Sequence, residues 1–208
     1  MKFSITLSAG LALAGLSTAA PLTARDAKTA AQIIGEISPN SLTCADAAEC
    51  RTNVQVAPFF VKAMSQYGLG NPGAIAAVLA LTAFESVDYK YKHNINPGRP
   101  GQGTSNMQMI DFNVEYAQSI PELKEKVAAI GAASTPEAQN KILALVTDDQ
   151  YNFGSGPWFL KNKCTPEVVA GLEKGTDAAF AAYMACVGVE VNEQRSAYWT
   201  RAKTAFGL

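Results

Sequence analysis

Glu85 is the residue of this sequence best placed to do acid–base chemistry. The twelve residues before it, 73–84, carry no charge, and helical spacing places Glu85 on the same side as Val78 and Leu81. A carboxyl group among apolar neighbours is poorly hydrated, which favours its neutral form and raises its pKa. We therefore predict that Glu85 is a general acid. The alternative is an ordinary polar residue at the exposed end of a core helix.

The residues after Glu85 change the pattern. Residues 87–95 alternate aromatic and branched side chains with polar ones, which is typical of a β-strand. Residues 96–106 are rich in glycine, proline and asparagine, which indicates a loop. The sequence thus predicts a small β-wing after a central helix that ends near Glu85.

Elsewhere the sequence favours helices, so the expected fold class is mainly α (α+β). Asn71-Pro72, Thr135-Pro136 and Thr165-Pro166 are helix-start signals, in which a capping side chain precedes a first-turn proline. The expected helices, besides the central one, cover residues 27–37, 54–70, 137–146, 167–175, 177–188 and 191–206.

Three short motifs occur in a fixed order: Glu85-Ser86, then Ser-Asn-Met-Gln at 105–108, then Gln-Tyr-Asn-Phe-Gly at 150–154. This order resembles the lysozyme-like superfamily, and most closely its branch of soluble lytic transglycosylases and goose-type lysozymes. The string from 96 to 108 also looks like that of a group of secreted fungal proteins. The resemblance covers about residues 73–158, and Ser105 and Asn106 stand where the branch has glycine and leucine.

The resemblance implies a lysozyme-like helical domain and a secreted glycoside hydrolase. Glu85 would be the catalytic acid that cleaves β-1,4 bonds of peptidoglycan, as in a lysozyme or muramidase. The sequence does not separate hydrolysis from lytic transglycosylation. Two alternatives stay open: a chitinase- or chitosanase-like hydrolase on the same fold, and a non-catalytic secreted glycan-binding or effector protein. The expected partner is a polysaccharide, either peptidoglycan or a chitin-like glycan.

The same resemblance assigns further roles. The residues expected to contact the substrate are Ser86, Tyr89, Asn106, Gln108, Tyr151 and Asn152. Tyr89 and Tyr91 could equally pack a wing onto the core. If a second carboxylate takes part, the candidates are Asp88, Asp111, Asp148 and Asp149. Trp158 and Trp199 are expected in the core, and His93 in a loop.

The ends and cysteines of the chain indicate export. Residues 1–19 have the basic, apolar and small-residue regions of a secretory signal, with a possible further cut after Arg25, which leaves 26–208 as a single lysozyme-like domain. Four cysteines in an exported chain suggest two disulfides, with three possible connectivities. We favour Cys44–Cys50 and Cys164–Cys186. With one histidine and no Cys-x-x-Cys pair, the sequence argues against a zinc site, and we expect no cofactor.

The charge of the chain excludes little. The formal net charge is −1, and no basic tract of the kind that follows a phosphate backbone is present. We therefore expect no nucleic-acid partner, no membrane span and a monomer. Because an excess of positive charge would draw a protein to a bacterial wall, the slight acidity weighs toward the non-catalytic alternative.

Overall fold

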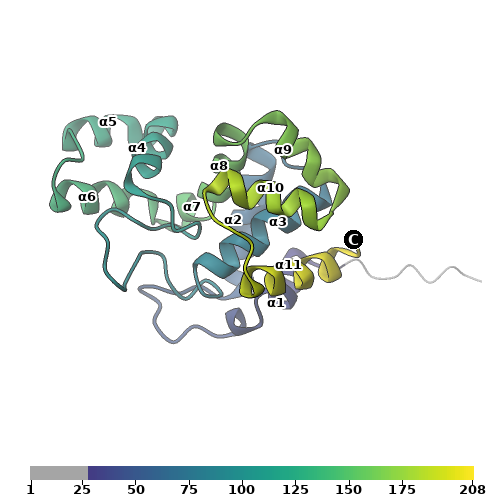
Figure 1. The fold of residues 1–208 in the computed structure, drawn as a ribbon. Helices are drawn as coiled ribbons and strands as arrows, with labels where there is room; N and C mark the ends of the chain where they lie inside the picture. The colour runs from purple at the N-terminus through teal and green to yellow at the C-terminus, as the bar shows by residue number, and fades with distance from the viewer. Residues whose placement is uncertain (1–27) are drawn as a thin grey trace, which may run out of the picture.

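A computed structural model describes residues 28–208, which form a mainly helical protein (Figure 1). The predicted signal peptide at 1–19, the possible cut after Arg25 and the first residues of the predicted domain lie outside the described part of the chain. The helices, in chain order, are α1 Ala30–Ile37, η1 Pro39–Leu42, α2 Asn53–Gln66, α3 Pro72–Glu85, α4 Ile110–Ser119, α5 Pro121–Ile130, α6 Pro136–Val146, α7 Asp149–Asn152, α8 Ser155–Lys163, α9 Pro166–Gly171, η2 Leu172–Lys174, α10 Asp177–Val187 and α11 Glu193–Phe206.

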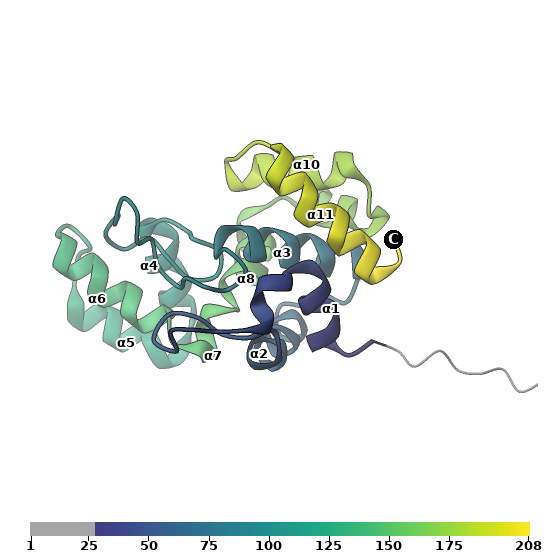
Figure 2. The same ribbon diagram turned by 90° about the horizontal axis from the view of Figure 1, so that it is seen from below.

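Helix α3 is the central element. The side chain of Asn71 accepts hydrogen bonds from the backbone N–H groups of Gly73 and Ala74, and Pro72 occupies the first turn, so the helix begins where the sequence predicts. The residues from Ala76 to Ala83 are all buried or nearly so, on every side of the helix. A helix that is apolar all round has to be enclosed. In Figure 2, α11 crosses directly beside α3, and the two helices pack extensively against each other.

The buried apolar side chains form two clusters. The larger one surrounds α3 and draws on α1, α2, α10 and α11. The smaller one lies among α4, α5 and α6, which sit together on one side of the molecule in Figures 1 and 2. Helix α8 contributes to both clusters: Leu160 faces the larger, whereas Trp158 and Phe159 face the smaller. The molecule therefore has two lobes, and the chain after α3 runs between them.

The prediction of a β-wing is wrong. Residues 28–208 contain no strand, only two isolated bridges that join His93 to Gly103 and Gly103 to Gln108. Val87, Asp88 and Tyr89 all have positive φ angles, of 53°, 57° and 61°. An extended strand requires negative φ, so the alternating pattern at 87–95 reflects a left-handed turn that buries some side chains and exposes others.

The predicted helices agree with the structure better than the predicted wing does. Every helix expected from the sequence is present within about three residues of its predicted start, except that the segment from 167 divides into α9 and η2. Helices α4, α5, α7 and α8 were not predicted. None of the helices in the described part of the chain is both long and apolar enough to cross a lipid bilayer.

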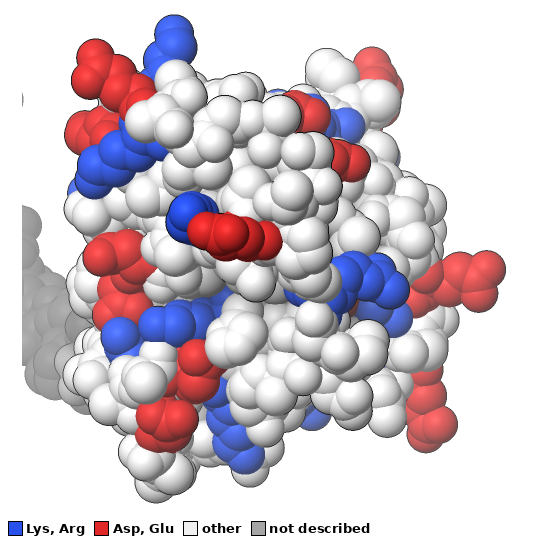
Figure 3. Space-filling model, turned by 90° about the vertical axis from the view of Figure 1, so that its left-hand side faces the viewer, with Lys and Arg blue, Asp and Glu red and all other residues white. Residues whose placement is uncertain are grey.

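The disulfide prediction is confirmed: Cys44 is bonded to Cys50 and Cys164 to Cys186. These bonds are compatible with an exported protein. The surface charge is mixed. On the face of α4, α5 and α6, Figure 3 shows acidic and basic side chains interspersed rather than gathered by sign. That face offers no single-sign field to attract a polyanion.

Candidate functional site

The site begins where α3 ends, and Ser86 organises that end. The Ser86 hydroxyl donates to the carbonyl oxygen of Thr82 (2.6 Å) and accepts from the N–H of Tyr89 (3.0 Å). Its carbonyl oxygen accepts from the N–H groups of Lys90 (3.0 Å) and Tyr91 (3.1 Å). Because these bonds satisfy the polar groups at the helix end, the chain reverses within a few residues while staying buried.

The backbone of this reversal has a conformation that most residues avoid. Positive φ is uncommon outside glycine, and for a β-branched residue such as Val87 it is an outlier. Thr104 and Met107 also have positive φ, of 66° and 44°. Val87 and Met107 both line the cleft described next. Strained backbone concentrated at a cleft is typical of a functional site.

A cleft of about 340 Å³ lies over this reversal. It is lined by Glu85, Val87, Tyr91, His93, Asn94, Ile95, Asn96, Gln102 and Met107, and we call it the Glu85 cleft. Three apolar residues of its rim are exposed: Val87 (48%), Tyr91 (40%) and Ile95 (52%). Asparagine and glutamine amides supply most of the polar lining. In the Glu85 cleft, the carboxyl group of Glu85 therefore lies among amide side chains and is bordered by exposed apolar surface.

Glu85 is held by a residue from the far end of the chain. Nη2 of Arg195, in α11, donates to Oε1 of Glu85 at 2.9 Å, and both side chains are largely buried, with 15% and 20% of their surface exposed. The guanidinium also stacks on the ring of Phe84, 4.4 Å from its centroid. Burial raises the pKa of Glu85 above its ordinary value, and the bond to Arg195, which lowers the pKa, offsets this only in part.

Two buried donors near this pair are unused. Within the described residues, the hydroxyl of Tyr183 and Nε of Arg195 have no hydrogen-bond partner. Burial, and after it the charge of Glu85, raises the pKa of the Tyr183 hydroxyl. Unsatisfied buried donors are rare and costly. Their presence here marks the Glu85–Arg195 pair as a region adapted to something other than stability alone.

Asp88 holds the reversal from behind. It is 2% exposed, and its carboxylate accepts from the N–H and Nδ2 of Asn40 (3.2 and 2.7 Å) and from the hydroxyl of Tyr198 (2.7 Å). Tyr198 in turn meets the ring of Phe84 edge to face. Asp88 thus connects η1, the reversal and α11, and its side chain does not line the Glu85 cleft.

A buried amide network supports the far side of the cleft. Nε2 of Gln108 donates to Oδ1 of Asn113 (2.8 Å), and Nδ2 of Asn113 donates to the carbonyl oxygens of Gly101 and Gln108. Oδ1 of Asn152 accepts from the N–H of Ser105 (2.9 Å). The side chains of Asn113 and Asn152 thus bond to backbone groups of the loop that a neighbouring strand could have paired. The loop at 96–108 is therefore ordered by side chains rather than by a sheet.

The structure buries most of the residues that the sequence grouped as a substrate site. Ser86, Tyr89, Asn106, Gln108 and Asn152 are each less than 6% exposed and occupied in internal contacts or packing. Tyr151 lies in another cavity, between α2 and the α4–α5 turn. Of the predicted site residues, Glu85 alone lines the Glu85 cleft. Contacts of the other six with a ligand stay a prediction.

The four candidate carboxylates also lie apart from Glu85. Asp88 is engaged as above, Asp111 faces a groove between α4 and α5, Asp148 caps α7, and Asp149 accepts from Nε of Arg51 at 2.6 Å. None of them is among the residues lining the Glu85 cleft. Conversely, the sequence analysis missed Arg195, Asn94 and Gln102. Arg195 is 110 positions from Glu85 and carries no local signal of the pairing.

The comparisons with known proteins disagree with the function that the motifs predict. The chain is 47% identical over 157 residues to the bifunctional dioxygenase (DOX)-epoxy alcohol synthase (EAS) of Fusarium oxysporum (strain Fo5176). The match covers 74% of this chain and spans only 12% of that protein. No family model matches the chain. No solved structure matches it either.

This similarity contradicts the predicted glycoside hydrolase, both as a muramidase that cleaves peptidoglycan and in its chitinase- or chitosanase-like form. The structure gives a physical reason. The prediction depended on three short motifs, and Gln108 and Asn152 of those motifs serve internal hydrogen bonds. Likeness to the lysozyme-like superfamily as a fold stays a prediction.

The described residues do not fit a copper or non-haem iron site held by several protein ligands. Enzymes carry out O₂ chemistry with haem, flavin, copper or non-haem iron, and the metals among these need His, Cys or carboxylate ligands. Within residues 28–208, no three such side chains gather into a metal-binding group. All four cysteines are in disulfides, and Nδ1 of His93 is paired with Glu49 at 2.9 Å. No step through such a group is derived for this chain.

Proposed function

We propose that this chain is a binding module that holds a small oxygenated molecule with an apolar portion in the Glu85 cleft. The observation that carries the proposal is the composition of the cleft, a poorly hydrated acid and several amides bordered by exposed Val87, Tyr91 and Ile95. Ligand sites in proteins commonly combine apolar walls with a few convergent polar groups. A ligand that fits has oxygen atoms at one end and carbon at the other.

The relative narrows the ligand class. Its name describes a dioxygenase and an epoxy alcohol synthase, and an epoxy alcohol combines an ether oxygen, a hydroxyl and a carbon skeleton. A protonated Glu85 would donate to the epoxide oxygen, and the amides of Asn94 and Gln102 would serve the hydroxyl. Because the chain spans 12% of the relative, we assign it recognition rather than either named reaction. We also propose that the protein is exported, on the strength of its two disulfides.

Calorimetric titration with a hexyl-substituted glycidol tests this proposal, with the saturated alcohol of equal length as the control ligand. We expect the epoxy alcohol to bind more tightly, and its affinity to fall as the pH rises through the pKa of Glu85, because the ionised carboxylate cannot donate. Equal affinity for both ligands, or no binding of either, would overturn the proposal.

Variants locate the binding. Ile95→Ser should weaken binding about tenfold, since a partly buried aliphatic side chain contributes on the order of 1–2 kcal/mol. Val61→Ser is the matched control, because Val61 is exposed (56%) but lies on α2 away from the Glu85 cleft. A parallel titration with an N-acetylglucosamine oligomer tests the polysaccharide partner, which stays a prediction. Tighter binding of that oligomer than of the epoxy alcohol would contradict the proposal.

A further inference from the structure

The loop closed by Cys44 and Cys50, together with Arg51 directly after it, contacts the segment 89–93 at three points, and one of the contacted residues, His93, lines the Glu85 cleft. Oε2 of Glu49 pairs with Nδ1 of His93 at 2.9 Å and accepts from the N–H of Lys92 at 3.5 Å. The N–H of Arg51 donates to the carbonyl oxygen of Tyr89 at 3.1 Å. His93 lines the cleft, and Tyr89 belongs to the strained reversal beneath it. The loop therefore fastens both the rim and the floor of the cleft.

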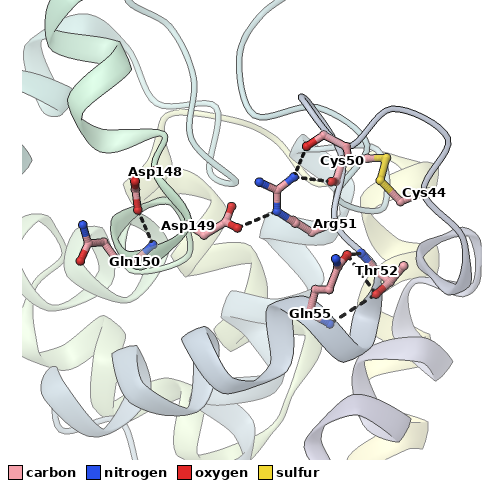
Figure 4. Close-up of polar contacts among 9 residues, drawn as sticks. Cys44, Cys50, Arg51, Thr52, Gln55, Asp148, Asp149 and Gln150 are labelled. Atoms are coloured by element: carbon pink, nitrogen blue, oxygen red, sulfur yellow. Dashed lines mark hydrogen bonds and ion pairs between the residues drawn. A yellow bond between two sulfur atoms is a disulfide. The ribbon is translucent and has the colours of Figure 1, made fainter.

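Arg51, directly after this loop, also reaches α7. Nε of Arg51 donates to Oδ2 of Asp149, at the start of α7, at 2.6 Å (Figure 4). Nη1 of Arg51 also donates to the carbonyl oxygens of Ala47 and Cys50, so the guanidinium fixes the loop to itself while it holds α7. Figure 4 shows Arg51 between the disulfide and Asp149. One loop thus ties together the reversal, the cleft rim and α7.

The loop itself is held by the disulfide and by a few polar contacts. Its residues from 45 to 48 are exposed, and its backbone makes turn bonds to Asp46 and accepts two hydrogen bonds from Nη1 of Arg51. A segment with few buried apolar contacts opens locally at low free energy unless a covalent bond restrains it. Cys44 is partly exposed, so a thiolate can reach its sulfur, whereas Cys50 is 5% exposed.

We propose that the Cys44–Cys50 loop is a redox-controlled clamp on the Glu85 cleft. Reduction by a dithiol breaks the S–S bond and yields two cysteine thiols, while the dithiol is oxidised to its own disulfide. The freed loop releases Glu49 from His93 and Arg51 from Tyr89. The cleft rim then becomes mobile. As regulation of the cleft, this inference rests on the proposed function, but the clamp itself is measurable without a ligand.

Hydrogen–deuterium exchange of the Cys44→Ser/Cys50→Ser variant tests the clamp. We expect amides at 87–95 to exchange about tenfold faster or more than in the parent, with α3 unchanged. The matched control is Cys164→Ser/Cys186→Ser, which removes the disulfide that joins the end of α8 to α10, away from the cleft. Unchanged exchange at 87–95 in the first variant, or an equal rise in the second, would overturn the clamp.

Two further measurements keep the test decisive. If the double variant fails to fold, Glu49→Ala removes the carboxylate that contacts His93 while both disulfides stay intact, and faster exchange at 92–95 is again expected. Titration of the oxidised parent with the hexyl glycidol separates the two proposals. Absence of binding there rejects the proposed ligand and leaves the clamp standing. Binding that is the same before and after reduction by dithiothreitol, with equal exchange, rejects the clamp alone.

Discussion

Helix α3 and the segment at 86–108 that follows it both place residues in the interior, but those residues are stabilised by different means. The interior of α3 is apolar apart from Thr82, whereas the buried residues of the segment include Ser86, Asp88, Thr104, Asn106 and Gln108. Apolar packing tolerates many sequences, but each buried polar group needs a specific partner. The Glu85 cleft lies over the polar segment, and the apolar packing around α3 supports it.

The difference predicts where volume matters most. Leu81, in the middle of α3, is 1% exposed, so Leu81→Ala leaves a cavity in the larger cluster and should lower the free energy of unfolding by about 2–5 kcal/mol. Denaturant unfolding followed by circular dichroism measures this loss. Val61→Ala, at an exposed position, should change stability by about 0.5 kcal/mol or less. A loss below about 1 kcal/mol for Leu81→Ala would mean that α3 is not the rigid support described above.

In the polar segment the partner matters more than the volume. Asp88→Ala leaves two donors of Asn40 and the Tyr198 hydroxyl without an acceptor, and places alanine at a φ of 57°. We expect a loss of about 1–3 kcal/mol in chemical denaturation. Asp88→Asn is the matched variant: it retains one acceptor oxygen, and asparagine tolerates left-handed backbone, so its loss should be smaller. Equal losses for the two variants would show that charge, not hydrogen bonding, holds the reversal.

The same contrast explains what the sequence could predict. The sequence predicts α3 from Asn71, Pro72 and the uncharged run after them, because the cap and the apolar composition act locally. The alternation at 87–95 suggested a strand because side-chain type carries no information about the sign of φ. The turn depends on the hydrogen bond from the Ser86 hydroxyl to the backbone of α3. The cleft depends on the contact between Glu85 and Arg195, which lies in α11. Such contacts depend on tertiary packing, which periodicity in one segment cannot reveal.

The smallest expected effect lies where the two interiors meet, at Glu85. Burial raises its pKa in the folded protein above the ordinary value of 4.5, so between these two pKa values the folded state binds more protons than the unfolded state. The contribution of Glu85 to stability is therefore complete below pH 4.5 and is lost as the pH rises through the folded pKa. Glu85→Gln should remove this slope.

Thermal unfolding of the parent and of Glu85→Gln between mildly acidic and neutral pH measures this effect. The amide oxygen still accepts from Arg195, so we expect the two melting temperatures to differ by no more than a few degrees and the variant to depend less on pH. Glu137→Gln is the control, because Glu137 is exposed and its pKa is lowered by Lys141, which gives the opposite slope. A parent that becomes more stable through this window, relative to Glu85→Gln, would show that Arg195 outweighs burial. Glu85 would then be an ordinary ion-pair partner, not the poorly hydrated acid on which the binding proposal depends.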